Sequence, residues 1–261
     1  MATASFDNTV KIWDPTNKTW TLKLTYTRHT SEINALEYLN ADTILSAGYD
    51  KTIQMWSIST GIQIGTINVG TSVISLKLLF NGYCLASGLF FGNINVYNIN
   101  DGSLIYTLTG HSNNVVDLIL INNDLLASSS NDYTIRIWNL TTNATKFILT
   151  GHGYIVFGLK LVSNDTLLSG SWDQTIKLWN ITSGTILRTF VNHTAEITWS
   201  VDMLSSDGQT LVSGSRDQTI KKWDATTGQL LDTVNTGLQI RSLSVLKALT
   251  PNQTSMFFHF N

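Results

Sequence analysis

The sequence NDTLLSGSWDQTIKLWNIT, residues 164–182, reads as two short strands, TLLSGS and TIKLWNI, joined by a tight turn at Trp172, Asp173 and Gln174. Apolar and polar residues alternate along these strands, which is the period of a half-buried β-strand. The stretch therefore predicts an antiparallel hairpin with one face on a hydrophobic core.

The same hairpin recurs along the chain, so an internal repeat organises the sequence. Its other copies cover residues 2–14, 43–57, 84–98, 125–139 and 210–224. An aromatic residue near the end of each copy recurs at steps of 43, 41, 41, 41 and 44 residues, in the order Trp13, Trp56, Tyr97, Trp138, Trp179 and Trp223. A period of this length is typical of the blades of a β-propeller.

Each hairpin is flanked by two further alternating segments, which gives a repeat unit of four strands, a to d. In one unit these strands are 115–121, 125–129, 134–140 and 145–151. Asn, Asp and Thr fill the turns between them, where their side chains can bond the local backbone. No segment has the period of a helix, so the predicted class is all-β, and the long repeat favours a propeller over a sandwich or barrel.

Composition limits the partners and the compartment. The 261 residues carry a formal net charge of −2 and no basic stripe, so we expect no nucleic-acid partner. Cys84 is the single cysteine, which excludes an intramolecular disulfide and fits the cytoplasm, with the nucleus as an alternative. The longest apolar runs are far shorter than a membrane span, so we expect no membrane partner.

Four polar or aromatic residue types recur at constant offsets within the repeats. A His lies 27 residues before the Trp in three repeats and 30 before it in a fourth, an Asp lies six before it and a Ser ten before it. The four complete sets are His29, Ser46, Asp50 and Trp56; His111, Ser128, Asp132 and Trp138; His152, Ser169, Asp173 and Trp179; and His193, Ser213, Asp217 and Trp223.

These motifs resemble the WD40 repeat family over nearly the whole chain. The resemblance rests on pairs such as Gly151-His152, on the Asp that follows, and on a third strand that ends in Trp-Asn or Trp-Asp. It implies that each set forms a hydrogen-bond chain that joins the loop before strand a to strands b and c of one blade. Buried carboxylate and imidazole groups are costly unless they are paired in this way.

The same residue types also invite a catalytic or a metal-binding interpretation. A Ser–His–Asp triad belongs to one cleft, whereas this set recurs in four repeats. The histidines are dispersed, and none lies in a Cys/His cluster. We therefore expect no catalytic residues, no metal, no cofactor and no enzymatic activity.

The third repeat departs from the pattern. Gly70 stands in place of the His, Phe91 in place of the Asp and Tyr97 in place of the Trp, and only Ser87 remains. We expect packing to hold this blade. We interpret the third repeat as the result of sequence drift at tolerated positions. The alternative is that Phe90 and Phe91 bind a partner.

The repeats predict how the ring closes. Strands b, c and d occur six times from Ala2 onward, and residues 240–246 offer a sixth strand a. We expect residues 1–246 to form one six-bladed domain in which 240–246 completes the first blade, with 247–261 as a tail outside the repeat register. The alternative is that the chain is a fragment of a seven-bladed or larger array.

The resemblance also implies a partner-binding face, formed by the b–c turns and the d–a loops around the central channel. The residues just before the Asp position of each turn are Phe6, Tyr49, Phe90, Asn131, Trp172 and Arg216; in the third repeat Phe91 stands at that position. We place Arg28 and Tyr154 beside them on the loops. Aromatic residues and Arg dominate interface hot spots. The sequence therefore predicts a non-enzymatic scaffold that binds a protein or peptide on this face.

Two alternatives to this scaffold function remain. The chain can be one propeller segment of a larger multidomain protein, or an enzyme with a pocket over the channel. Three aromatic residues lie outside the repeat pattern, Trp20, Tyr26 and Trp199. We expect them to fill the core or a blade edge.

Overall fold

The computed structural model describes residues 1–14, 20–204, 208–247 and 254–260. It divides into two compact units, Met1–Asn123 and Asp124–Asn261. Within the described ranges the regular elements are strands, apart from a short 3₁₀ turn at Phe80–Gly82. The prediction of an all-β chain is therefore confirmed.

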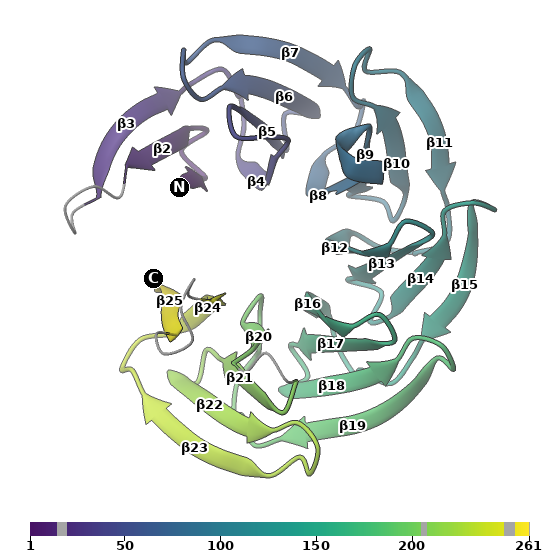
Figure 1. Ribbon diagram of the computed structural model, residues 1–261, viewed down its shortest axis with the longest axis vertical. Coiled ribbons are helices and arrows are strands. Elements are labelled where there is room, and N and C mark those ends of the chain that lie inside the picture. The colour runs from purple at the N-terminus through teal and green to yellow at the C-terminus, as the bar shows by residue number, and fades with distance from the viewer. Residues whose placement is uncertain (15–19, 205–207, 248–253, 261) are drawn as a thin grey trace. The chain divides into compact units, whose positions relative to one another are not determined.

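The first unit consists of antiparallel sheets whose strand order follows the chain (Figure 1). One sheet comprises β1 (Ala2–Ala4), β2 (Val10–Asp14) and β3 (Thr21–Tyr26). The next comprises β4 (Ile33–Tyr38), β5 (Thr43–Gly48), β6 (Thr52–Ser57) and β7 (Gln63–Asn68). It is followed by β8 (Val73–Leu79), β9 (Cys84–Leu89), β10 (Ile94–Asn98) and β11 (Leu104–Leu108), and then by β12 (Val115–Asn122).

The second unit repeats this arrangement. It begins with β13 (Leu125–Ser130), β14 (Ile135–Asn139) and β15 (Ala144–Leu149). Two sheets follow: β16 (Val156–Ser163), β17 (Thr166–Ser171), β18 (Thr175–Asn180) and β19 (Thr185–Val191), then β20 (Val201–Met203), β21 (Thr210–Gly214), β22 (Thr219–Asp224) and β23 (Leu230–Asn235).

Burial falls from the second strand of each sheet to the fourth. In β17 every residue after Thr166 is buried, whereas β19 alternates between buried or half-buried and exposed residues. The second strand is covered on both faces, and the fourth is an edge strand with one face on the core. This agrees with the sequences, because TLLSGS has no charged residue and only small polar ones, whereas TILRTFV places Arg188 and Thr189 among its apolar residues.

Glycine marks the closest approach of neighbouring sheets in the second unit. A Cβ added at Gly170 would lie 2.8 Å from Cγ2 of Ile197, and one at Gly214 would lie 2.4 Å from Cγ2 of Ile240. Both glycines lie near the end of a second strand, where the next sheet packs against it.

A β-bulge precedes the repeated aromatic residue of each hairpin. In β18 the register with β19 shifts between Leu178 and Trp179, and in β10 the register with β11 shifts between Val96 and Tyr97. Such a bulge turns a side chain away from the regular alternation. Here the extra residue is Leu187 of β19, while the pairing of β17 with β18 stays regular and places Trp179 opposite Leu167.

The repeat pattern predicts a strand a over residues 197–204 in the sixth repeat, but β20 covers only Val201–Met203. The preceding residues also bond toward β24 (Ile240–Lys247): Trp199 forms an isolated parallel bridge with Ser242, and its carbonyl accepts from the N–H of Leu243. Because of this competing pairing, the regular strand begins only at Val201.

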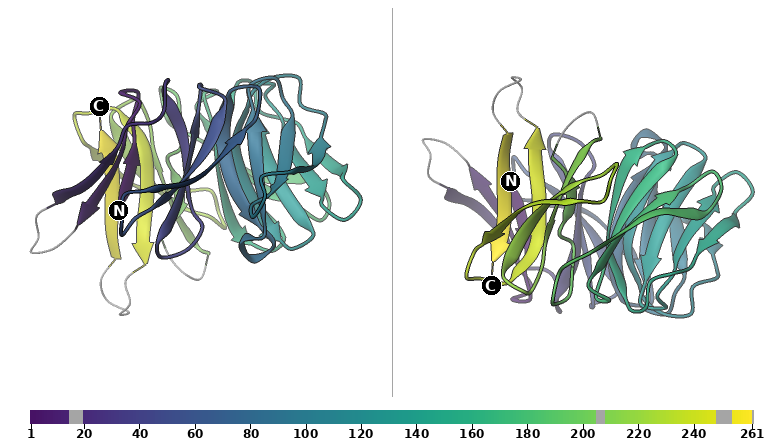
Figure 2. Two further views of the ribbon diagram at one scale, coloured as in Figure 1. Left: turned by 90° about the horizontal axis from the view of Figure 1, so that it is seen from above. Right: turned by 90° about the horizontal axis from the view of Figure 1, so that it is seen from below.

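β24 pairs antiparallel with β25 (Thr254–Phe260), so the predicted tail contains a strand, visible as one of the neighbouring yellow strands in Figure 2. Closure by residues 240–246 and a single domain over 1–246 stay predictions. No described segment is a helix long and apolar enough to cross a membrane.

Candidate functional site

The turn between the second and third strands is built around an aspartate. In the hairpin of β17 and β18, Oδ1 of Asp173 accepts from the backbone N–H (2.9 Å) and the hydroxyl (2.7 Å) of Thr175. The next position, Gln174, has a φ of 70°. Asp50 with Thr52 and Asp217 with Thr219 repeat this geometry. The carboxylate therefore fixes the turn and leaves its other oxygen for a second partner.

That second oxygen binds the predicted histidine. Nδ1 of His152 lies 2.7 Å from Oδ2 of Asp173, and its Nε2 lies 2.7 Å from Oγ of Ser169. Trp179 donates its indole N–H to the same Oγ at 2.8 Å. A neutral imidazole satisfies this chain, because Nδ1–H donates to the carboxylate while Nε2 accepts from the serine hydroxyl. The loop before β16 is thus tied to β17 and β18.

Two further predicted sets have the same geometry. In the first unit, His29 lies 2.6 Å from Asp50 and 2.7 Å from Ser46, which accepts from Trp56 at 2.8 Å. In the second unit the corresponding set is His193, Asp217, Ser213 and Trp223, with distances of 2.7, 2.8 and 2.8 Å. These contacts leave the buried polar atoms of both sets paired.

The fourth set divides between the two units. His111 is buried in the first unit. Ser128, Asp132 and Trp138 belong to the second, where Trp138 donates to Ser128 at 2.7 Å and Asp132 accepts from Thr134.

Burial and the carboxylates determine the charge of these sets. Burial lowers the pKa of His152 and of His193 below the ordinary value of 6.5, although the neighbouring aspartates act in the opposite direction. Burial also raises the pKa of Asp173, but the hydrogen bond and charge of His152 and the bonds from Thr175 and Gly153 outweigh it and hold the pKa below 3.8. At neutral pH the sets of His152 and His193 therefore hold a neutral imidazole and a carboxylate.

This arrangement does not suit acyl transfer. Ser169 is fully buried, and its oxygen already accepts from an indole. A nucleophile must reach the substrate carbonyl. Among the described residues there is also no group of three or more His, Cys, Asp or Glu that could hold a metal ion.

The third repeat has a different set of contacts. Ser87 is buried and donates to the backbone oxygen of Asn95 at 3.4 Å. The side-chain amide of Asn95 donates to the hydroxyl of Tyr97 at 2.9 Å, and its oxygen accepts from Thr107 at 2.8 Å. Phe91, at the aspartate position, is 74% exposed. The sheet therefore keeps a polar contact at the aromatic ring but none that reaches the turn through a carboxylate.

The predicted partner-binding residues of the second unit lie together. Tyr154 stacks on Trp172 with ring centroids 6.0 Å apart, and the guanidinium of Arg216 lies 5.5 Å from the same ring. Tyr154 lies in the loop before β16, Trp172 in the β17–β18 turn and Arg216 in the β21–β22 turn.

Three residues that the sequence did not assign to this face extend the contact. Tyr133 stacks on Tyr154 (5.2 Å), Phe157 stacks on Trp172 (4.9 Å) and Trp199 meets Phe157 edge-on (4.7 Å). The following six residues are called the Trp172 cluster: Tyr133, Tyr154, Phe157, Trp172, Trp199 and Arg216. Tyr133, Tyr154 and Trp199 are 41, 44 and 45% exposed.

One of the missed residues carried a signal in the sequence. Tyr133 has a φ of 72° at the turn position where other repeats place Asn, Lys, Gln or Gly, and an aromatic residue is unusual there. Trp199 was expected at the core or a blade edge, but nearly half of its surface is exposed. Tyr26, by contrast, is buried and stacks on Trp56 at 4.7 Å.

The first unit holds a smaller aromatic surface. Tyr49 meets Phe90 at 6.4 Å, and Phe90 meets Phe91 at 5.0 Å, both edge to face. We call these three residues the Tyr49 patch. Phe6 and Arg28 are exposed in the same unit, and no ring contact of either is seen within its described residues.

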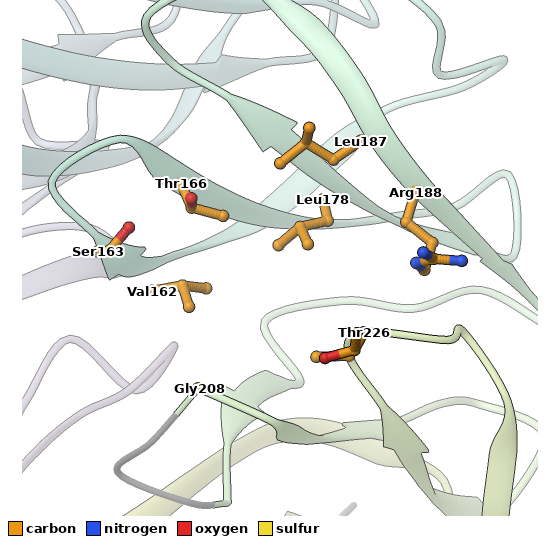
Figure 3. Close-up of a pocket in the computed structure, with 9 residues that line it drawn as sticks. Val162, Ser163, Thr166, Leu178, Leu187, Arg188, Gly208 and Thr226 are labelled. Atoms are coloured by element: carbon orange, nitrogen blue, oxygen red, sulfur yellow. The ribbon is translucent and has the colours of Figure 1, made fainter.

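A cavity lies between two neighbouring sheets of the second unit (Figure 3). It measures about 630 Å³ and is lined by side chains of both sheets, among them Val162, Leu178, Leu187, Arg188 and Thr226. Arg188 donates to the backbone oxygen of Thr227 at 2.7 Å, so it bridges the sheets. The Trp172 cluster contributes no residue to the lining of this cavity.

Comparison with protein families identifies the repeat. The WD40 family model, described as "WD domain, G-beta repeat", matches residues 1–14, 20–57, 102–139, 143–180 and 184–224. A crystal structure of the WD40 β-propeller domain of Doa1 covers 93% of the chain and is itself covered over 81%, with a TM-score of 0.77 and 24% identity. The predicted propeller class is therefore confirmed.

Curated relatives match over shorter stretches. Human WD repeat-containing protein 97 is 34% identical over 71 residues, the nuclear distribution protein nudF of Aspergillus niger 34% over 91, and the APC/C activator protein CDC20 of Saccharomyces cerevisiae 36% over 80. These stretches are 27, 34 and 29% of the chain but only 4, 20 and 13% of the relatives. The chain therefore matches a small part of each relative.

Proposed function

The chain belongs to the WD40 family, and we propose that it is a non-enzymatic interaction module that binds a protein or peptide through the Trp172 cluster and the Tyr49 patch. The family is in general one of interaction scaffolds, and the matched relatives include an APC/C activator and a nuclear distribution protein by name. The proposal goes further by assigning the binding surface.

The Trp172 cluster carries the proposal. Exposed apolar residues that are contiguous usually mark an interaction site, whereas scattered ones do not. Here four ring contacts join five aromatic residues, and Arg216 adds a cation over Trp172. Trp, Tyr and Arg are also the residues that contribute most to binding energy at interfaces.

The backbone holds these rings in place before any partner binds. The N–H of Trp172 donates to Ile155 O at 3.0 Å, and the N–H of Arg216 donates to Glu196 O at 3.0 Å. Ser129 donates to the backbone oxygen of Phe157 at 3.0 Å. A surface fixed in this way loses little conformational entropy on binding.

The Tyr49 patch supports a second contact area. Phe91 is mostly exposed where other repeats bury a turn carboxylate, and the space around Gly70 holds no atom within 4 Å of an added Cβ. We propose that the Tyr49 patch is a second partner-binding surface, formed within the first unit. The compartment proposed for this module is the cytoplasm, with the nucleus as an alternative, since Cys84 is the single cysteine.

Selection from a display library of short random peptides tests the function. The wild-type protein is expected to enrich a defined set of peptides, and the double variant Tyr49→Ala with Trp172→Ala is expected to lose them. Trp20→Ala is the matched control, because Trp20 is exposed but lies outside both surfaces. Thermal unfolding shows that each variant is folded. The proposal fails if the wild type enriches nothing, or if the double variant enriches the same peptides equally well.

A further inference from the structure

We propose that the Trp172 cluster binds a proline-rich segment in the extended polyproline II conformation. The inference rests on the proposed function and names the class of partner for one of its two surfaces. It follows from the arrangement of the rings, from the hydrogen-bonding atoms of the cluster and from the lack of other charges on it.

The rings form a continuous row. Tyr133, Tyr154, Trp172 and Phe157 follow one another with interplanar angles of 20, 12 and 28°, and Trp199 closes the row edge-on at 76°. The four steps of 4.7–6.0 Å together span at most about 21 Å, which is the length of six to seven residues of polyproline II at about 3.1 Å per residue. Aromatic-lined surfaces of this kind bind proline-rich segments, whose preformed conformation loses little entropy.

The cluster offers hydrogen-bond donors that have no partner. Among the described residues, Nε1 of Trp172 and Nε of Arg216 are buried without a hydrogen-bond partner. Both atoms can only donate, and a buried donor left unpaired costs about 1–3 kcal/mol. Because both atoms are buried, carbonyl oxygens of a ligand satisfy them only if the side chains of Trp172 and Arg216 shift on binding.

The turn aspartates beside the cluster already use both carboxylate oxygens, whereas Oδ1 of Asn131, in the turn that also holds Tyr133, is a buried acceptor without a partner. Both carboxylate oxygens of Asp173 accept hydrogen bonds, from His152 and Gly153 on one side and from Thr175 on the other. Asp217 has the equivalent bonds from His193, Thr194 and Thr219. A surface with spare donors fits a ligand that mainly accepts, and proline residues have a carbonyl but no N–H.

The backbone around the cluster disfavours a β-strand as the ligand. Strand addition needs an edge with free N–H and C=O groups. The cluster instead lies on turns and loops, where the N–H groups of Trp172, Asp173 and Arg216 are already bonded within the protein. The ligand must therefore be held by its side chains and carbonyl oxygens.

Charge disfavours single-stranded nucleic acid, which would also stack on aromatic rings. Such binding requires a positive groove that follows the phosphates. The cluster has one guanidinium, and the chain has a net charge of −2. A proline-rich segment needs no such charge.

A titration of fluorescently labelled decaproline, followed by anisotropy, tests the inference. We expect saturable binding by the wild-type chain, at least about tenfold weaker binding by Trp172→Ala, and unchanged binding by Trp20→Ala. Tyr154→Ala is expected to weaken binding more than Tyr154→Phe, because the second variant keeps the ring. A labelled Gly/Ser peptide of equal length is expected not to bind.

The outcomes separate the ligand class from the proposed function. If decaproline does not bind but the peptide selection yields Trp172-dependent peptides without proline, the ligand class is wrong and the proposed function stands. If labelled oligo-dT binds in a Trp172-dependent manner and decaproline does not, the surface is one for nucleic acid and the inference is overturned. Equal binding of decaproline by Trp172→Ala and the wild type would overturn it as well.

Discussion

The sheet β16–β19 and the sheet β8–β11 share strand order and the register shift before their aromatic residue, yet they hold that residue differently. Trp179 lies opposite Leu167 and Tyr97 opposite Leu85, so the rings occupy the same place in each sheet. Only the first sheet connects its ring through Ser169 and His152 to a turn aspartate. The register therefore does not depend on the hydrogen-bond chain, which instead fixes the turn and the preceding loop to the sheet.

The largest effect is expected at the turn aspartate. Asp173→Ala removes the acceptor of His152, of Gly153 N–H and of both donors of Thr175. We expect it to lower the free energy of unfolding by about 3 kcal/mol, because buried donors are left unpaired. Urea-induced unfolding measures this loss, and amide hydrogen exchange at residues 172–175 locates it.

Phe91→Ala is the matched control in the other sheet. Phe91 occupies the equivalent turn position but is mostly exposed, so we expect a change within about 0.5 kcal/mol. Equal losses in the two variants would show that the carboxylate does not distinguish the sheets.

The serine is expected to show the next largest difference. Ser169→Ala leaves the indole N–H of Trp179 and Nε2 of His152 without their buried partner, which we expect to cost about 2 kcal/mol. Ser87→Ala removes only a 3.4 Å contact to Asn95 O, so we expect less than about 0.5 kcal/mol. Thermal and urea unfolding of the two variants compare them directly, and a loss at Ser87 as large as that at Ser169 would contradict the comparison.

Acid should weaken the sheets that His152 and His193 hold together. The pKa values of His152 and His193 are lowered in the folded protein, so the stability that their neutral forms provide is present above about pH 6.5 and is lost as the pH falls toward the folded pKa. Asp173 and Asp217 contribute in the same direction, but only below about pH 3.8. Unfolding measured between pH 7 and pH 5 therefore reports mainly on the histidines.

His152→Gln should flatten this dependence without abolishing it, because His193 still titrates. We expect hydrogen exchange of the loop before β16 to rise with acid in the wild type. The turn of β9 and β10 should not respond, since its sheet has glycine at the histidine position. A response in that turn as large as in the loop would show that acid acts through other groups.

Much of this architecture was predictable from the sequence. The alternation of apolar and polar residues and the turn residues predicted the hairpins, because both are local signals. The period of the aromatic residues predicted that the hairpins repeat. The spacing of His, Ser, Asp and Trp also pointed to a shared hydrogen-bond chain in each repeat. The late start of strand 197–204 was not predictable, because it depends on contacts with a segment some 40 residues away, such as Trp199 with Ser242.

The candidate site was only partly predictable. Trp172, Tyr154 and Arg216 follow from their place before or beside the turns, but their stacking requires neighbouring sheets to meet at particular distances. Phe157 illustrates the difficulty, because it lies on a strand whose alternation predicts a core residue, yet it stacks on Trp172 at the surface of the sheet. The sequence motif of one repeat does not predict which side chains of neighbouring repeats come into contact.

The smallest expected difference in unfolding free energy between the two sheets is the one between variants of their aromatic residues. Tyr97→Phe keeps the ring and removes a hydroxyl that accepts from Asn95, which is half-buried and can bond to water instead. We expect a loss of at most about 1 kcal/mol, compared with about 2 kcal/mol for Trp179→Phe, which leaves the buried Oγ of Ser169 without the indole donor. Urea unfolding of both variants gives the difference. A larger loss for Tyr97→Phe would mean that the Asn95 contacts replace the histidine chain in holding the sheet. If Tyr97→Phe loses less than Trp179→Phe, packing holds the sheet β8–β11. The turn between β9 and β10 is then not needed for a hydrogen-bond chain and can expose Phe91.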